Sequence, residues 1–267
     1  MAINLTTTDY VSFGDLSAID GATELSILFT VKTGGTISND ERMVSKWLGP
    51  IDFSFLAFCV GGDDVGFVVA ESNSTVTWRG RQTTSNVLSA NTTYRIGFRW
   101  RASDQAMEIW LDGVSQSLST LVWDNSPASI AATAATVRVG DSVDANVMDG
   151  DYSDVAIYTS YVPDGHMYAH GKGFSPRLFT NIAKPVAYFR GLNTTDILDP
   201  YNATSMSNSG AADAGHPNTI YPRRKQVVVA SAAAAASTIG FLRDNAGVGS
   251  MGGGPFSRSN AGLGVLA

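Results

Sequence analysis

The most regular pattern of hydrophobic and polar positions lies between residues 94 and 113. Residues 94–101 read Tyr-Arg-Ile-Gly-Phe-Arg-Trp-Arg and residues 107–112 read Met-Glu-Ile-Trp-Leu-Asp. Alternation with a period of two places the apolar set and the polar set on opposite faces of a β-sheet. The polar segment 102–106 between the two runs suits a hairpin turn. The pattern therefore predicts two paired strands with one buried face and one charged face.

Similar short runs recur from Tyr10 to about Tyr161, separated by Gly, Asp, Asn and Ser. Regular short strands between turn residues are typical of β-sandwiches. The predicted fold class is all-β, a two-sheet antiparallel sandwich. We expect strands at 10–13, 24–32, 42–47, 53–60, 65–70, 75–79, 94–101, 107–111, 118–123, 136–140 and 152–158.

The chain changes character after these runs. A helix is expected from Pro163 to about His170, and residues 185–190 predict one further strand before a loop-rich region. From Gln226 onward about two-fifths of the residues are Ala or Gly, too few large apolar groups to fold alone. The expected divisions are a sandwich over 1–170, an extension over 171–225 and a low-complexity C-terminal tail over 226–267.

The amino-acid composition favours strands over helices, and the net charge bears on which kinds of partner the protein could bind. Only 16% of the residues are charged, against roughly 25% in average globular proteins. Twenty Asp stand against four Glu, and Asp favours turns whereas Glu favours helices. The net charge of −6 gives no reason to expect a nucleic-acid partner.

A membrane anchor is a weak alternative for the tail. Arg223, Arg224 and Lys225 precede the stretch 227–242, but that stretch has 16 residues and half of them are Ala or Ser. A spanning helix needs about 20 strongly apolar residues. We therefore expect no membrane partner.

The single Cys59 cannot form an internal disulfide. It lies within the strand-like run 53–60, where the simplest interpretation is a buried small apolar residue. The alternative is a reactive thiol, but no His lies near it in sequence.

An ordered series of segments resembles a LamG-like domain of the concanavalin A-like lectin/glucanase superfamily over about residues 8–170. The segments are Tyr10–Gly14, Glu24–Lys32, Met43–Lys46, Thr93–Trp100, Glu108–Gly113, Val137–Gly140 and Gly150–Tyr158. The resemblance implies a jelly-roll sandwich.

Later segments resemble C-terminal portions of LamG-like proteins encoded by tailed bacteriophages. They are Phe174–Pro176, Val186–Phe189, Ile197–Pro200, Asn208–Gly210 and His216–Pro222. The resemblance implies a non-enzymatic virion structural protein, capsid- or tail-associated and of the decoration or fibre type. The N-terminal residues lack the basic start and apolar core of a signal peptide, so synthesis in the host cytoplasm is expected.

On this interpretation the partners are other virion subunits, and the chain forms a homo-oligomer. The tail would anchor the sandwich, becoming ordered on assembly. Its apolar contacts would come from Phe241, Leu242, Phe256 and Leu263. The alternative function is a free carbohydrate-binding, lectin-like module.

No catalytic site is expected. Glucanases of the superfamily carry an E-x-D-x-(x)-E arrangement on one strand, and this sequence has none. The pair that most resembles this arrangement is Glu108 with Asp112. The two residues are four positions apart on a strand, which corresponds to roughly 13 Å. Glycosidase carboxylates stand about 5–9.5 Å apart.

No cofactor is expected either. His166 and His170 are spaced to share a helix face, but two ligands do not make a zinc site. The Asp-rich stretch 141–154 could hold Ca²⁺, as some LamG-like domains do at the sandwich rim. It lacks the bidentate Glu and the spacing of an EF-hand, and Asp between strands usually forms turns.

Arginines gather near the central hairpin. Arg95, Arg99 and Arg101 must share one strand face, close to Trp110. If residues 75–81 pair nearby, Arg79 and Arg81 would add to the same basic face. A basic face of this kind would bind an acidic or sulfated glycan, or an acidic neighbouring subunit. The alternative is a solvated outer face without a ligand.

Overall fold

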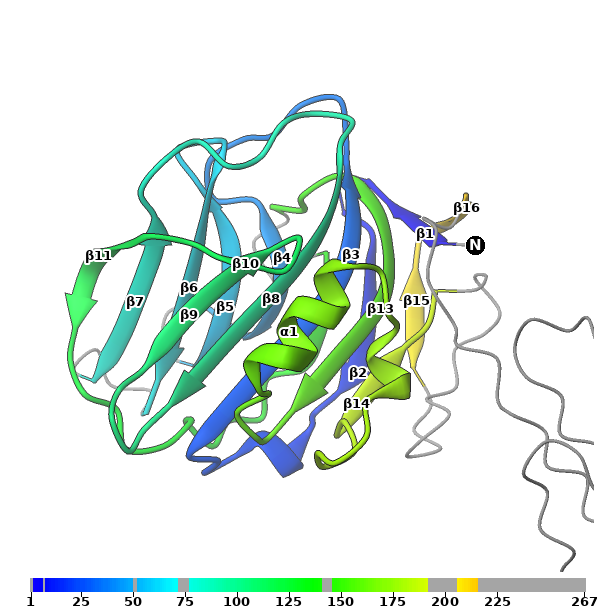
Figure 1. Ribbon diagram of the computed structural model, residues 1–267. Coiled ribbons are helices and arrows are strands. Elements are labelled where there is room, and N and C mark those ends of the chain that lie inside the picture. Colours follow the sequence, from blue (N-terminus) through cyan, green and yellow to red (C-terminus); the bar gives the residue numbers. More distant parts are fainter. Residues whose placement is uncertain are drawn as a thin grey trace, which may run out of the picture. The chain divides into compact units, whose positions relative to one another are not determined.

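The computed structural model describes residues 2–6, 8–49, 52–71, 77–140, 146–191 and 206–215. Two eight-stranded antiparallel sheets stack face to face (Figure 1). The expectation of a two-sheet antiparallel sandwich is confirmed.

Sheet A has the strand order β10-β9-β8-β3-β13-β1-β16, and β14 lies beside β13. Its strands are β1 (Ala2–Leu5), β3 (Glu24–Thr33), β8 (Thr93–Arg101), β9 (Met107–Leu111), β10 (Val114–Ser115), β13 (Gly150–Tyr158), β14 (Ala187–Phe189) and β16 (Ala212–Ala214).

Sheet B has the order β11-β7-β6-β5-β4-β12-β2-β15. Its strands are β2 (Tyr10–Gly14), β4 (Arg42–Trp47), β5 (Phe53–Val60), β6 (Asp64–Ala70), β7 (Trp78–Thr83), β11 (Leu118–Asp124), β12 (Val137–Val139) and β15 (Ser207–Ser209). Three helical segments accompany the sheets: η1 (Ser17–Ile19), α1 (Asp164–Gly171) and η2 (Pro176–Leu178).

The predicted hairpin at 94–113 is the β8–β9 pair. Phe98 pairs with Ile109 and Trp100 with Met107, so apolar side chains of both strands lie on the face toward sheet B. Phe98 crosses the core to contact Phe67 of sheet B, with ring centroids 5.1 Å apart. Burying rings of this size contributes roughly 2–3 kcal/mol each, so these contacts hold the two layers together.

The extension after residue 170 is part of the sandwich. Its described residues hold three strands rather than the single one predicted. β15 pairs with β2 in sheet B, and β16 pairs with β1 in sheet A. The segment 206–214 therefore completes one edge of each sheet, and its Met206 is buried in the inter-sheet core.

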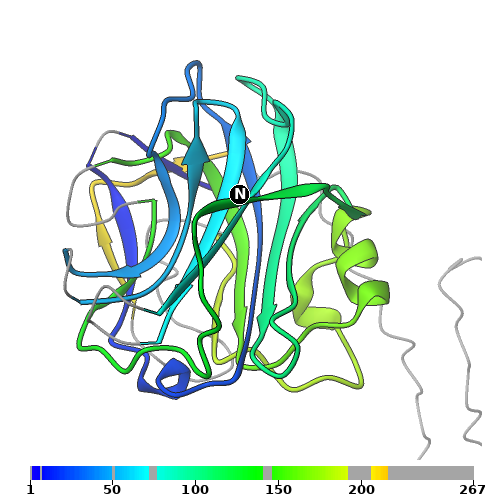
Figure 2. The same ribbon diagram turned by 90° about the vertical axis from the view of Figure 1, so that its left-hand side faces the viewer.

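A second layer covers the outer face of sheet A. We call residues 161–191 the cap; they hold α1 and η2 over this face, and their strand β14 joins sheet A beside β13. Met167 of α1 packs with Leu28 and Tyr158 of the sheet in a buried cluster. Gly171 stands so close to the backbone of Gly113 that no side chain fits there. Figure 2 shows that α1 lies beside sheet A and not beside sheet B.

Candidate binding surfaces

Arg99 lies beneath the cap and is 2% exposed. Its guanidinium donates to the carbonyl oxygen of Val162 at 2.7 Å, to Glu108 at 2.7 Å and to Asp164 at 2.6 Å. The expectation that Arg99 stands on an exposed basic face is wrong, because α1 and the segment before it cover that part of sheet A. Arg99 instead attaches the beginning of α1 to β8.

Trp110 and Tyr161 complete this network. Both donate to Glu108, the Trp110 indole at 2.8 Å and the Tyr161 hydroxyl at 2.7 Å. The Arg99 guanidinium carbon lies 4.3 Å from the centroid of the Tyr161 ring and 5.2 Å from that of Trp110. The predicted site residues Arg99 and Trp110 are thus brought together, but as parts of a mostly enclosed network.

The other arginines are divided between the two sheets. Arg101 pairs with Asp104 at 2.6 Å, and Arg95 lies on the same face of β8, partly exposed. Arg79 and Arg81 belong to sheet B, where both pair with Asp124. The expectation that residues 75–81 pair beside this face is wrong, because β7 lies between β6 and β11 in sheet B.

The two carboxylates of the central hairpin have structural roles. Glu108 accepts three hydrogen bonds, one of them from its ion-pair partner Arg99. Burial opposes ionisation of Glu108, but the donors together hold the pKa of this carboxyl below its ordinary value. A carboxyl group with a lowered pKa is poorly suited to general acid catalysis, which favours a raised pKa. Asp112 accepts the backbone N–H of Arg95 at 2.9 Å, which fixes the end of the hairpin.

The two helix histidines do not share a metal-binding face. His170 is 2% exposed and its Nε2 lies 3.0 Å from the carbonyl oxygen of Phe29. His166 is partly exposed, with its Nε2 3.0 Å from the carbonyl oxygen of Thr180. The described residues contain no cluster of three or more metal-ligating side chains. His170 is buried against β3 whereas His166 is partly exposed, so the two imidazoles do not share one exposed helix face.

Cys59 is fully buried, as the apolar interpretation predicts. Its Sγ lies 3.4 Å from the Sδ of Met148. Burial raises the pKa of this thiol, which disfavours the reactive thiolate.

The Asp-rich stretch is described only in part. Asp151 accepts the side-chain amide of Asn4 at 2.7 Å. Asp154 is buried and accepts hydroxyl groups from Ser175 at 2.9 Å and Tyr188 at 2.6 Å. Positions 141–145 lie outside the described residues, and so do the predicted tail contacts Phe241, Leu242, Phe256 and Leu263. No described helix is long and apolar enough to cross a bilayer.

The outer face of sheet B carries an apolar cluster that the sequence analysis missed. The ring of Phe53 lies 4.4 Å from that of Trp47 and 5.0 Å from that of Trp78, both in edge-on contact. Leu56, Phe58 and Val68 extend the cluster across β5 and β6. We call Trp47, Phe53, Leu56, Phe58, Val68 and Trp78 together the aromatic face. A detectable signal existed: the runs 53–60 and 65–70 are apolar at nearly every position, which indicates burial on both faces.

Arg42 stands at the edge of the aromatic face. Its guanidinium carbon lies 5.3 Å from the Trp47 ring centroid and 5.9 Å from that of Phe58. Trp47 remains partly exposed, and its buried indole N–H has no hydrogen-bond partner among the described residues. The next residue, Leu48, is 47% exposed. A partly exposed aromatic ring beside a cation is suited to binding a molecule that is apolar on one side and polar on the other.

A shallow open pocket of about 290 Å³ lies at the rim of the sandwich. It is lined by Ile37, Gly61, Gly62, Asp63, Leu88 and Ala90, which come from three loops. Backbone hydrogen bonds from Val87 and Leu88 to the carbonyl oxygen of Asp63 hold two of these loops together.

No model of a known protein family matches this sequence. No curated protein matches it either. Many solved structures share its fold. One is a putative carbohydrate binding protein from Bacteroides ovatus, with a TM-score of 0.57 and 8% identity over 79% of this chain. The chain spans 59% of that protein.

Another is a native heptameric SAP-like pentraxin from Limulus polyphemus, with a TM-score of 0.50 and 11% identity. This match covers 68% of the chain and 88% of the pentraxin. At such identities the likeness concerns the fold alone. The chain therefore shares the jelly-roll sandwich fold of these two structures, which is the fold that the resemblance implied.

Proposed function

We propose that this chain is a non-catalytic module that binds carbohydrate at Trp47, on the edge of the aromatic face of sheet B. The observation that carries the proposal is the partly exposed Trp47 ring, with the Arg42 guanidinium beside it. The apolar side of a sugar ring can lie against an aromatic ring while its hydroxyl groups meet polar partners. The names of similarly folded proteins, one of them described as carbohydrate-binding, support the same function.

Trp47→Ala tests this proposal. Full-length protein would be applied to an array of immobilised glycans, and we expect wild type to be retained on a subset of them. Loss of the ring should weaken retention about tenfold or more, as for other central aromatic contacts. Tyr168→Ala is the matched control, because it removes an exposed ring from the cap and should leave glycan binding unchanged. Retention of no glycan, or equal retention of the Trp47 variant in a folded state, would contradict the proposal.

We also propose that the chain acts as a structural component of a bacteriophage virion, capsid- or tail-associated, with its sandwich displayed. The segments Val186–Phe189 and Asn208–Gly210, on which the resemblance to phage proteins rests, overlap β14 and β15. They are therefore integral to the two sheets rather than an appendage. The low-charge segment 226–267 would hold the sandwich to neighbouring subunits.

Deletion of 226–267 tests this second role. We expect the shortened protein to remain soluble and folded but to be missing from purified particles, as judged by immunogold electron microscopy. Full-length protein provides the control for labelling. Incorporation of the shortened protein at the wild-type level would contradict the anchoring role.

A further inference from the structure

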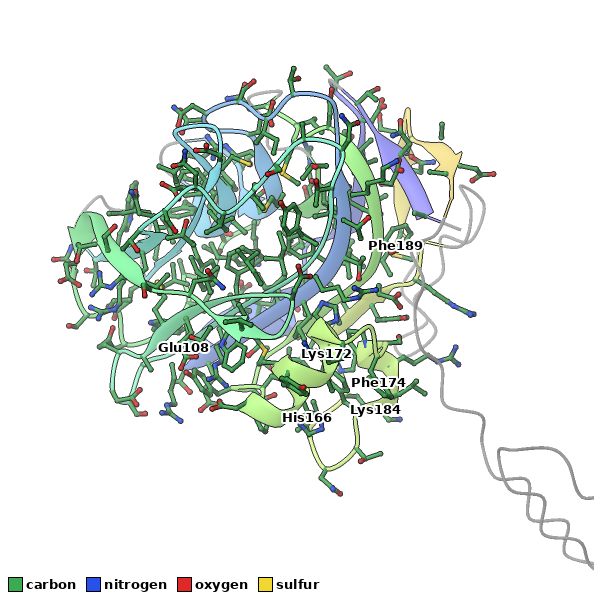
Figure 3. The ribbon with its side chains drawn as sticks, turned by 45° about the horizontal axis from the view of Figure 1, so that its top comes forward. Glu108, His166, Lys172, Phe174, Lys184 and Phe189 are labelled. Carbon is green, nitrogen blue, oxygen red and sulfur yellow. The ribbon has the colours of Figure 1, made fainter. Side chains whose placement is uncertain are left out.

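Positive charge is concentrated in the cap. Residues 161–191 contain four basic residues and one acidic residue, although the whole chain has a net charge of −6. That acidic residue, Asp164, is already paired with Arg99 at 2.6 Å. Lys172 and Lys184 are exposed, and neither forms an ion pair with a described residue. Figure 3 labels both, Lys172 directly after α1 and Lys184 in the loop that follows η2.

An exposed aromatic ring stands among these charges. Tyr168 of α1 is 55% exposed, and the Lys172 ammonium lies 5.0 Å from its ring centroid. Val114, which is 58% exposed, follows Gly113, where the β9–β10 turn touches the end of α1. We call Val114, Tyr168, Lys172 and Lys184 the cap face. Exposed Tyr with a cation and an apolar neighbour is the composition of a protein interface.

The rim pocket has the opposite charge. Asp63 lines it, and Asp40 and Asp64 flank the same β5–β6 turn. None of these three carboxylates forms an ion pair with a described residue. Ile37, Leu88 and Ala90 contribute apolar side chains to its wall, and the rest of its lining is polar. The rim therefore offers an open, mostly polar recess beside uncompensated negative charge, which is complementary to the tyrosine hydroxyl and the lysines of the cap face.

We propose that the cap face of one molecule docks into the rim pocket of a second copy of this chain. Tyr168 would enter the recess, and Lys172 and Lys184 would meet the carboxylates around it. The two surfaces belong to different parts of the molecule, so the contact is head-to-tail and builds rings or filaments rather than two-fold dimers. A nucleic acid fits less well, because four basic residues in an acidic protein fall short of a polyanion-binding surface.

Sedimentation velocity of the full-length protein tests the proposal. We expect association that increases with protein concentration and weakens as salt is raised, since exposed charges are screened within about 10 Å at 0.1 M salt. Lys172→Glu with Lys184→Glu should weaken association about tenfold or more, and so should Asp63→Lys with Asp64→Lys. Trp47→Ala is the matched control and should associate like wild type, so this test is independent of glycan binding.

Mixing the two charge-reversed proteins gives the decisive result. Each should associate weakly alone, whereas the mixture should build assemblies in which the two variants alternate, because the reversed cap meets the reversed rim and the unchanged cap meets the unchanged rim. Monomeric wild type at every concentration, or association that the charge reversals do not change, would overturn the proposal. So would monomeric wild type that binds heparin through Lys172 and Lys184, since the cap face would then recognise a polyanion.

Discussion

Arg99 and Glu108 face each other across the β8–β9 pair, with Nη2 of the arginine 2.7 Å from Oε2 of the glutamate. The arginine side chain is 3% exposed and the glutamate side chain 30%. Because the same guanidinium also binds the loop before α1 and its first residue, this pair connects the cap to sheet A.

Arg99→Ala should therefore lower the free energy of unfolding by about 3 kcal/mol, because it leaves Glu108 and the Val162 carbonyl without their buried donor. Urea denaturation measures this change. Arg101→Ala is the matched control on the same strand, and removing its exposed pair with Asp104 should cost less than about 1 kcal/mol. Equal effects would contradict the role of Arg99 as a buried anchor.

His170 should make folding sensitive to acid. Burial lowers the pKa of His170 from its ordinary value of 6.5, although the Phe29 carbonyl and Asp154 oppose this shift and Arg95 adds to it. The unfolded chain thus binds a proton more readily than the folded one. The stability contribution is complete above about pH 6.5 and is lost as the pH falls toward the folded-state pKa, at up to about 1.4 kcal/mol per pH unit.

Urea denaturation at pH 7.5 and pH 5.5 tests this sensitivity. His170→Gln should reduce the loss of stability between the two pH values, whereas the control His166→Gln on the same helix should leave it unchanged. An identical pH dependence in wild type and the His170 variant would show that this imidazole is not the sensor.

Cys59 should react slowly with thiol reagents in the native protein. Its side chain is completely enclosed and burial raises its pKa, so both access and thiolate are suppressed. Because it is the only cysteine, the colour released from Ellman's reagent reports this site alone. Guanidinium-unfolded protein provides the reference rate, and comparable rates in the two states would contradict the burial.

The edge segment 206–214 should be required for stability. A chain ending before Met206 loses β15 and β16 and uncovers the N-terminal strands that they pair with. We expect its free energy of unfolding to fall by about 3 kcal/mol, of the size of one or two buried apolar side chains. A chain ending at Tyr221 keeps both strands and is the matched control. Equal stability of the two would contradict the structural role of this segment.

Period-two alternation predicted most of the sandwich, because strands with one buried face have a clear signature. The central hairpin and α1 lie close to their expected positions. β7 was misplaced because Arg79 and Arg81 occupy the positions that alternate with Trp78 and Gly80, and a glycine gives no hydrophobic signal. β1, β15 and β16 have only three or four residues, too few for a period to appear.

The candidate site was harder to predict because it depends on which sheet face is covered. Alternation shows that Arg99 and Trp110 lie on the face away from the core, but not that the cap lies over it. The fully buried Lys46 illustrates the same limit, since its partners Asp15 and Asp20 come from a distant loop. Arg99 and Lys46 have structural roles only because the fold brings partners that are distant in sequence next to them.

The pairing of β1 with both β13 and β16 has a consequence for biosynthesis. β1 must wait for partners about 150 and 210 positions later in the chain. Local hairpins such as β5–β6 can form early during translation, but the closure of both layers needs residues 206–214 to be synthesised first. Until then the nascent protein exposes unpaired strand edges, so chaperones that shield such edges should govern its yield in cells.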